Sequence, residues 1–97
     1  MQTNKSGFTK RELECFNPQH FLSVTVDGNC IHATSKTTLD SWVIEKKLDD
    51  KGNYYCLYHQ HARDLQRAYH DHAQFRKLYE CVQQIVGHDR WMNRRKE

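Results

Sequence analysis

The spacing of apolar residues changes near residue 60, and this change constrains the fold more than any other feature of the chain. Before that point apolar and polar residues alternate, which is the pattern of strands with one buried face. After it, apolar residues recur every three or four positions from Leu65 to Val86, with no Gly or Pro between them. That longer spacing is typical of one amphipathic helix. The sequence therefore predicts an α+β fold, in which one long C-terminal helix packs on an antiparallel sheet.

The alternating part divides into two β-hairpins, so we expect a four-stranded sheet within residues 20–59. Asp-Gly-Asn at residues 27–29 marks the first turn, and Asp-Asp-Lys-Gly-Asn at residues 49–53 marks the second. The two-residue loop of this turn is either 27–28 or 28–29, and both choices put Ile31 and Ala33 on the same face as Val24 and Val26. The inner face of the first hairpin is therefore defined by the sequence.

The second hairpin leaves two registers open. A two-residue loop puts Tyr55 and Leu57 on the inner face of the sheet. A three-residue loop puts Tyr54, Cys56 and Tyr58 there instead. We favour the two-residue loop, because it leaves the hydroxyls of Tyr54 and Tyr58 in water.

The N-terminal segment completes a single domain that spans residues 1–97. Residues 1–7 are polar, and we expect them to be loose. Thr9 and Glu12 have the spacing of a capping box, which predicts a short helix over residues 10–16.

The C-terminal segment is expected to form a helix over residues 62–86, with Gly87 as its C-terminal cap and a basic tail at 88–97. A helix of about 25 residues is roughly 38 Å long, whereas a strand of about seven residues spans only about 23 Å. Part of the helix should therefore overhang the sheet. The overhanging apolar residues would be Val82, Ile85 and Val86. Either the N-terminal helix covers them, which we favour, or a second copy of the chain does so in a homodimer.

Composition restricts the class of protein. The net charge of +3 is weakly basic, and the four cysteines are widely spaced with no CxxC motif. No apolar leader and no membrane-spanning stretch is present in the sequence. We therefore expect a cytoplasmic protein with free thiols and no cofactor.

No group of residues forms a clear catalytic or metal site. No thiol lies next to a helix start or a clear local base that would activate it. The nearest approach to a thiol–base pair is Cys30 with His32, which would be neighbours on one face of a strand. Cys56 and His59 would point to opposite faces of a strand. We therefore expect no enzymatic activity and no bound metal, and the nearest approach to a ligand set is Cys56 with His59 and His61.

The outer face of the expected sheet indicates a binding function. The residues assigned to this binding surface are Phe21, His32, Lys47, Tyr54 and Tyr58. Tyrosine is favoured in protein interfaces, so the leading hypothesis is a small regulator or inhibitor that acts through protein–protein contact, of the kind that phages and mobile elements encode. One alternative is DNA or RNA binding by the same face together with basic residues of the tail. Those basic residues are Arg90, Arg94, Arg95 and Lys96. A further alternative is a zinc-binding protein.

Overall fold

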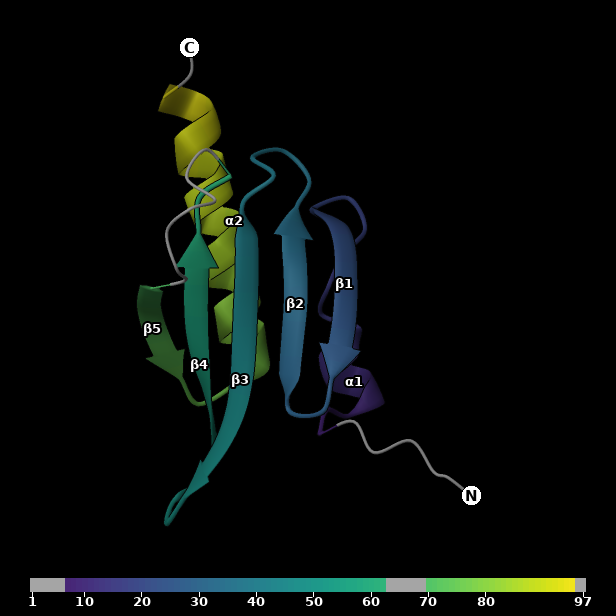
Figure 1. Cartoon of the computed structure of the whole chain (residues 1–97), viewed down its shortest axis with the longest axis vertical. Helices are drawn as coiled ribbons and strands as arrows, with labels where there is room; N and C mark the ends of the chain where they lie inside the picture. Colours follow the sequence, from purple (N-terminus) through teal and green to yellow (C-terminus); the bar gives the residue numbers. More distant parts are fainter. Residues whose placement is uncertain (1–6, 63–69, 96–97) are drawn as a thin grey trace.

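The computed structural model describes residues 7–62 and 70–95, and it confirms the α+β class. The antiparallel sheet has five strands, one more than the sequence predicts. Two helices accompany it within these described residues (Figure 1). In chain order the elements are α1 (Lys10–Leu13), β1 (Phe21–Asp27), β2 (Cys30–Ser35), β3 (Ser41–Asp49), β4 (Gly52–Gln60), β5 (His70–Phe75) and α2 (Leu78–Arg95).

Each strand pairs with the next strand in the chain, so the sheet is a simple meander in the order β1-β2-β3-β4-β5. In the second hairpin Asp49 pairs with Gly52, which leaves a two-residue loop. Ile44 therefore lies opposite Leu57, and Tyr55 shares their face. This confirms the register with the two-residue loop, which we favoured from the sequence.

The prediction of one helix over residues 62–86 is wrong. Residues 70–75 form the strand β5, and the helix starts only at Leu78, where the Lys77 backbone N–H donates to the Glu80 carboxylate. The helix then continues through Gly87, so that residue is not its cap, and residues 88–95 are helical and do not form a tail.

Strand β5 forms because it pairs with β4. Ala73 lies opposite Leu57, and Phe75 lies opposite Tyr55, so the apolar residues of β5 extend the inner face. Without β5, the nine-residue strand β4 would be an unpaired edge. Pairing with the preceding strand therefore overrides the helical spacing of this segment.

Both helices pack on the same face of the sheet, which we call the inner face; the other is the open face. The core consists of Phe8, Phe21, Ile31, Ala33, Trp42, Ile44, Tyr55, Leu57, Leu78, Cys81, Val82 and Ile85. Leu13 and Phe16 from the N-terminal segment pack against this core. The capping box of Thr9 and Glu12 is present, although α1 is shorter than expected.

The residues expected to overhang the sheet are also wrong. Because α2 starts later than predicted, the sheet itself covers Val82 and Ile85, which are 8% and 0% exposed, and Val86 packs against the same core. A homodimer through these three residues is therefore not supported. The part of α2 that extends past the ends of the strands is its C-terminal end (Figure 1).

Phe21 lies on the inner face and not on the outer face, contrary to the prediction. The register of β1 against β2 shifts between Phe21 and Ser23, so the strict alternation assumed from the sequence fails there. Phe21 is 5% exposed and contacts the ring of Phe16, while Leu22 is 62% exposed. Phe21 therefore belongs to the core.

Candidate metal centre

The inner face of the sheet carries two polar clusters, at separate places along strands β3 and β4. The acid–lysine cluster consists of Glu12, Lys46 and Tyr55. The histidine cluster consists of Asp40, His59, His61 and His88. In the ladder Lys46 pairs with Tyr55, and Trp42 pairs with His59. Four residues along each strand separate the two clusters, which is roughly 13 Å.

Strand β4 supplies two of the histidines. His59 continues the inner-face alternation of Tyr55 and Leu57, and His61 follows two positions later, directly after the strand. The His59 ring is 2% exposed and stacks on the Trp42 indole, with ring centroids 3.9 Å apart and planes 7° apart. His61 is about half exposed. The His59 ring is therefore the buried part of the histidine cluster, and the His61 ring is its solvent-exposed part.

The loop between β2 and β3 supplies the carboxylate. Asp40 is buried, and its Oδ2 lies 2.8 Å from His59 Nε2 and 3.4 Å from His61 Nδ1. The backbone N–H of Ala62 donates to the other oxygen, Oδ1, at 2.9 Å. The preceding residue, Leu39, has a φ of 63°, which is unfavourable for a side chain with a Cβ. The loop thus bears backbone strain next to the carboxylate that points into the cluster.

Helix α2 supplies the third histidine. His88 lies one turn after the core residue Ile85, which orients it toward the sheet. Its ring centroid is 4.7 Å from that of His59. Buried Asp89 lies 3.4 Å from His88 Nδ1 and accepts a hydrogen bond from the Thr38 hydroxyl at 3.2 Å. A carboxylate behind an imidazole is the arrangement that orients many metal-binding histidines.

The four donor atoms of the histidine cluster lie within 4.8 Å of one another. Tetrahedral zinc with bonds of about 2.0–2.1 Å requires neighbouring donors to be roughly 3.3 Å apart. Two of the contacts, at 2.8 and 3.4 Å, are close to that separation. The remaining donor–donor distances, which are at most 4.8 Å, would have to shorten toward about 3.3 Å to complete the coordination geometry.

The protonation states in the cluster also suit a metal. Burial lowers the pKa of His59 to about 4, and the neighbouring His61 acts in the same direction, against the hydrogen bond to Asp40. Burial by itself would raise the pKa of Asp40, but the Ala62 N–H and the His59 contact hold it below its ordinary value. At neutral pH the cluster therefore offers a carboxylate and a neutral imidazole at its centre, which are the forms that bind metals.

The structure brings together two of the three residues that the sequence suggested as the nearest approach to a ligand set. His59 and His61 lie in the cluster, whereas Cys56 lies on the open face of β4, where it pairs with Glu45. Asp40 and His88 were missed. Neither residue has a spacing to His59 and His61 that would indicate a metal site in the sequence. The folding of the sheet and the packing of α2 bring Asp40 and His88 into the cluster.

The acid–lysine cluster has a different character. Lys46 Nζ lies 3.1 Å from Glu12 Oε1, the Tyr55 hydroxyl donates to Glu12 Oε2, and Lys46 also donates to the Gly7 carbonyl. Burial alone would raise the pKa of Glu12, but the bonds from Tyr55, Thr9 and Lys46 lower it overall. One carboxylate thus meets one ammonium group, and the charges balance within the cluster.

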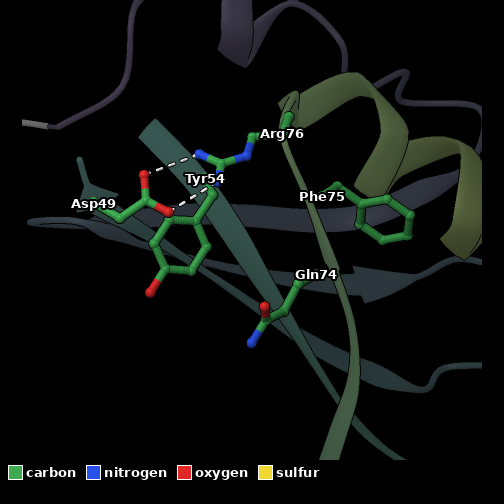
Figure 2. Close-up of a pocket in the computed structure, with 5 residues that line it drawn as sticks. All are labelled: Asp49, Tyr54, Gln74, Phe75 and Arg76. Atoms are coloured by element: carbon green, nitrogen blue, oxygen red, sulfur yellow. Dashed lines mark hydrogen bonds and ion pairs between the residues drawn. The ribbon is translucent and has the colours of Figure 1, made fainter. Parts of the chain in front are cut away.

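A pocket of about 330 Å³ lies between the β3–β4 turn and the end of β5 (Figure 2). Figure 2 shows Arg76 directed at Asp49, to which its two terminal nitrogens donate at 2.8 and 3.1 Å. The guanidinium group also lies 5.5 Å from the centre of the Tyr54 ring. Since Asp49 already neutralises the arginine, this pocket is poorly suited to an anionic ligand.

The open face carries four of the residues assigned to a binding surface. These residues are His32, Lys47, Tyr54 and Tyr58. The Tyr58 hydroxyl donates to Glu45 at 3.1 Å, and Lys47 lies 3.7 Å from the same carboxylate. Polar contacts between strands therefore organise part of this face.

Of the basic residues considered for nucleic-acid binding, Arg90 and Arg94 are exposed on α2. Lys96 and the side chain of Arg95 lie outside the described residues.

All four cysteines are free thiols, and burial raises the pKa of Cys81 to about 12. Burial also raises the pKa of Cys30, which disfavours the thiolate of the suggested pair with His32.

Comparison of the chain with protein-family models, with curated proteins and with solved structures gives no significant match. Within the described ranges, neither helix has the length and apolar character needed to cross a membrane.

Proposed function

We propose that this protein binds one divalent transition-metal ion, most suitably Zn²⁺, in the histidine cluster. The observation that carries this proposal is the convergence of four donor atoms within 4.8 Å of one another. They come from three separate parts of the chain: the β2–β3 loop, the end of β4 and helix α2.

The donor chemistry favours zinc over the common alkaline-earth ions. Three imidazoles and one carboxylate form a nitrogen-rich set, which suits Zn²⁺, Ni²⁺ or Cu²⁺. Mg²⁺ and Ca²⁺ prefer oxygen ligands. The filled d shell of Zn²⁺ imposes no geometry of its own, and in structural sites the ion is usually tetrahedral with four ligands. This cluster offers four donors.

A purely structural interpretation would need only the buried hydrogen bond between Asp40 and His59. In that interpretation the contacts of His61 with Asp40 and of His88 with Asp89 add only to the stability of the fold, whereas metal binding requires both imidazoles as ligands. Substitutions at those two positions therefore separate the two interpretations.

The test is isothermal titration of untagged, metal-stripped protein with zinc chloride. We expect one equivalent of Zn²⁺ to bind, and His61→Ala and His88→Ala each to weaken that binding strongly. His32→Ala is the matched control, because His32 is exposed on the open face, and it should bind as the native chain does. Magnesium chloride should give no binding. Absence of zinc binding, or affinity unchanged in the His61→Ala/His88→Ala double variant, would refute the proposal.

A second candidate function is binding of a protein partner through the open face, as a cytoplasmic regulator or inhibitor. It is supported by the placement of both described helices on the inner face, with Tyr54 and Tyr58 partly exposed on the other. The free thiols are in keeping with a reducing compartment. Alanine at both tyrosines should weaken partner binding without unfolding the domain.

Affinity capture from a nuclease-treated lysate tests this second candidate, with Tyr54→Ala/Tyr58→Ala beside the native chain. A protein retained by the native chain and lost by the variant supports it. If gel shifts show DNA or RNA binding that weakens steeply with salt, the nucleic-acid alternative through the exposed Arg90 and Arg94 takes its place. A variant that unfolds would show that the tyrosines are part of the core.

A further inference from the structure

The two halves of α2 are attached to the sheet in different ways. The first half, before Gly87, buries the apolar residues Leu78, Cys81, Val82 and Ile85. In the second half, Asp89 is the one buried residue among the described side chains, and Trp91 is 49% exposed. Figure 1 shows this yellow end of the helix extending past the strands. Apolar burial therefore stabilises the first half far more than the second.

Gly87 lies at the junction between the two halves. Glycine in a helix interior is less favourable than alanine by about 1 kcal/mol, because it loses more backbone freedom on folding. A Cβ at this position would meet no atom within 4 Å, so no close packing contact requires a glycine here. Since short helical segments with little apolar burial are marginal in water, the segment after Gly87 depends on its polar and ring contacts with the rest of the chain.

His88 and Asp89 provide that attachment in the first turn after the junction. Asp89 accepts from the Thr38 hydroxyl in the β2–β3 loop, and His88 joins Asp40 and His59 in the histidine cluster. An ion held by those donors would connect the helix to the β2–β3 loop and to β4 at one point.

We propose that the metal ion acts as a clamp that fastens the second half of α2, residues 87–95, to the sheet. This inference rests on the proposed metal site. The protein would fill all four positions of a tetrahedral ion, so no position is left for a water or a substrate, and the role is structural. The second half of the helix is then more firmly ordered in the metal-bound protein, and it frays more readily in the metal-free protein, where only the contacts of His88 and Asp89 hold it.

Hydrogen exchange of the full chain, read by mass spectrometry with and without saturating Zn²⁺, tests the clamp. We expect zinc to slow exchange of the amides at 91–95 by about tenfold or more, and to change those at 82–86 much less, because the core already protects the first half. In His88→Ala at saturating zinc, the selective protection of 91–95 should be lost.

Gly87→Ala leaves every donor in place and supplies a second, independent measurement. It should slow exchange at 91–95 without metal, and it should therefore reduce the zinc-dependent difference. If zinc binds stoichiometrically but the protection of 91–95 does not change, the clamp is wrong and the metal site stands. If no zinc binds, the site and the clamp are both wrong.

Discussion

The acid–lysine cluster and the histidine cluster lie on the same face of the same two strands, yet they differ in how their charges are balanced. In the first, the Glu12 carboxylate meets the Lys46 ammonium group and the Tyr55 hydroxyl. In the second, the buried Asp40 carboxylate meets imidazoles, and the nearest of them, His59, is neutral at pH 7 because burial lowers its pKa to about 4. Among the described residues, no side chain that is permanently cationic contacts Asp40.

This difference teaches how to separate a structural polar cluster from a ligand site. A buried carboxylate is costly unless a cation or several hydrogen bonds compensate it. Lys46 compensates Glu12 from within the chain, whereas a divalent cation from solution would compensate Asp40 and use the imidazole lone pairs at the same time. The charge of Glu12 is therefore balanced by a cation of the chain, whereas the charge of Asp40 is stabilised by hydrogen bonds and would be balanced by the proposed metal ion.

The largest expected effect is on thermal stability. At a free zinc concentration 100 times the dissociation constant, binding to the folded state adds about 2.7 kcal/mol to the free energy of unfolding. For a domain of this size that raises the melting temperature by roughly 10 to 20 °C. Circular dichroism melts with and without zinc measure the shift. His61→Ala should reduce it, and an undiminished shift in that variant would place the metal elsewhere.

The second prediction concerns acid stability of the metal-free protein. The folded pKa of His59, about 4, lies below its ordinary value of 6.5, so below pH 6.5 the unfolded chain takes up a proton that the folded chain does not. The stability contributed by His59 is thus full above about pH 6.5 and is lost progressively down to about pH 4. The pKa of Glu12 is also lowered, from 4.5, so its contribution is lost only at pH values below that.

Urea denaturation of metal-free protein at pH 7, 5 and 4 separates these two ranges. The loss between pH 7 and 5 should come from the histidine cluster, and His59→Gln should flatten it. Glu12→Gln should leave this range unchanged and alter only the loss below about pH 4.5. An equal effect of Glu12→Gln in the upper range would contradict the distinction between the clusters.

The third prediction breaks the acid–lysine cluster. Lys46→Met leaves a largely buried Glu12 without its cation and should lower the free energy of unfolding by about 1 to 2 kcal/mol, with zinc affinity unchanged. Lys47→Met is the matched control, because Lys47 pairs with Glu45 on the open face, and exposed pairs contribute at most about 1 kcal/mol. Urea titrations measure both. Reduced zinc affinity in Lys46→Met would show that the two clusters are coupled.

Local patterns predicted the parts of the fold that local interactions determine. The turns and alternation of residues 20–59 gave both hairpins and the inner position of Tyr55 and Leu57. Residues 70–75 were assigned to a helix, because their apolar spacing fits both structures and only pairing with β4 selects the strand. The register shift after Phe21 likewise depends on β2, so strict alternation misplaced that residue.

The candidate site shows the same division. His59 and His61 are two apart in the sequence, and this close spacing made them part of the nearest approach to a ligand set. Asp40 and His88 are 48 residues apart in the sequence, and they meet only because α2 packs on the inner face of the sheet. Once the start of the helix was assigned 16 residues too early, no spacing argument could place His88 at the histidine cluster.

The smallest expected effect comes from Gly87→Ala, which touches neither cluster directly. If metal binding must order residues 87–95, part of the binding free energy is used for that ordering, and a better helix former lowers this cost. Zinc affinity should therefore increase by up to about fivefold, since about 1 kcal/mol of helix propensity is available and 1.4 kcal/mol is tenfold. Competition titration with a chromophoric chelator measures the change.

Gln83→Ala, at an exposed position in the first half of α2, is the control and should leave the affinity unaltered, because the core already orders that half. Equal affinity in Gly87→Ala and the native chain would mean that the second half of α2 is already ordered without metal, and the clamp would then be wrong although the metal site stands.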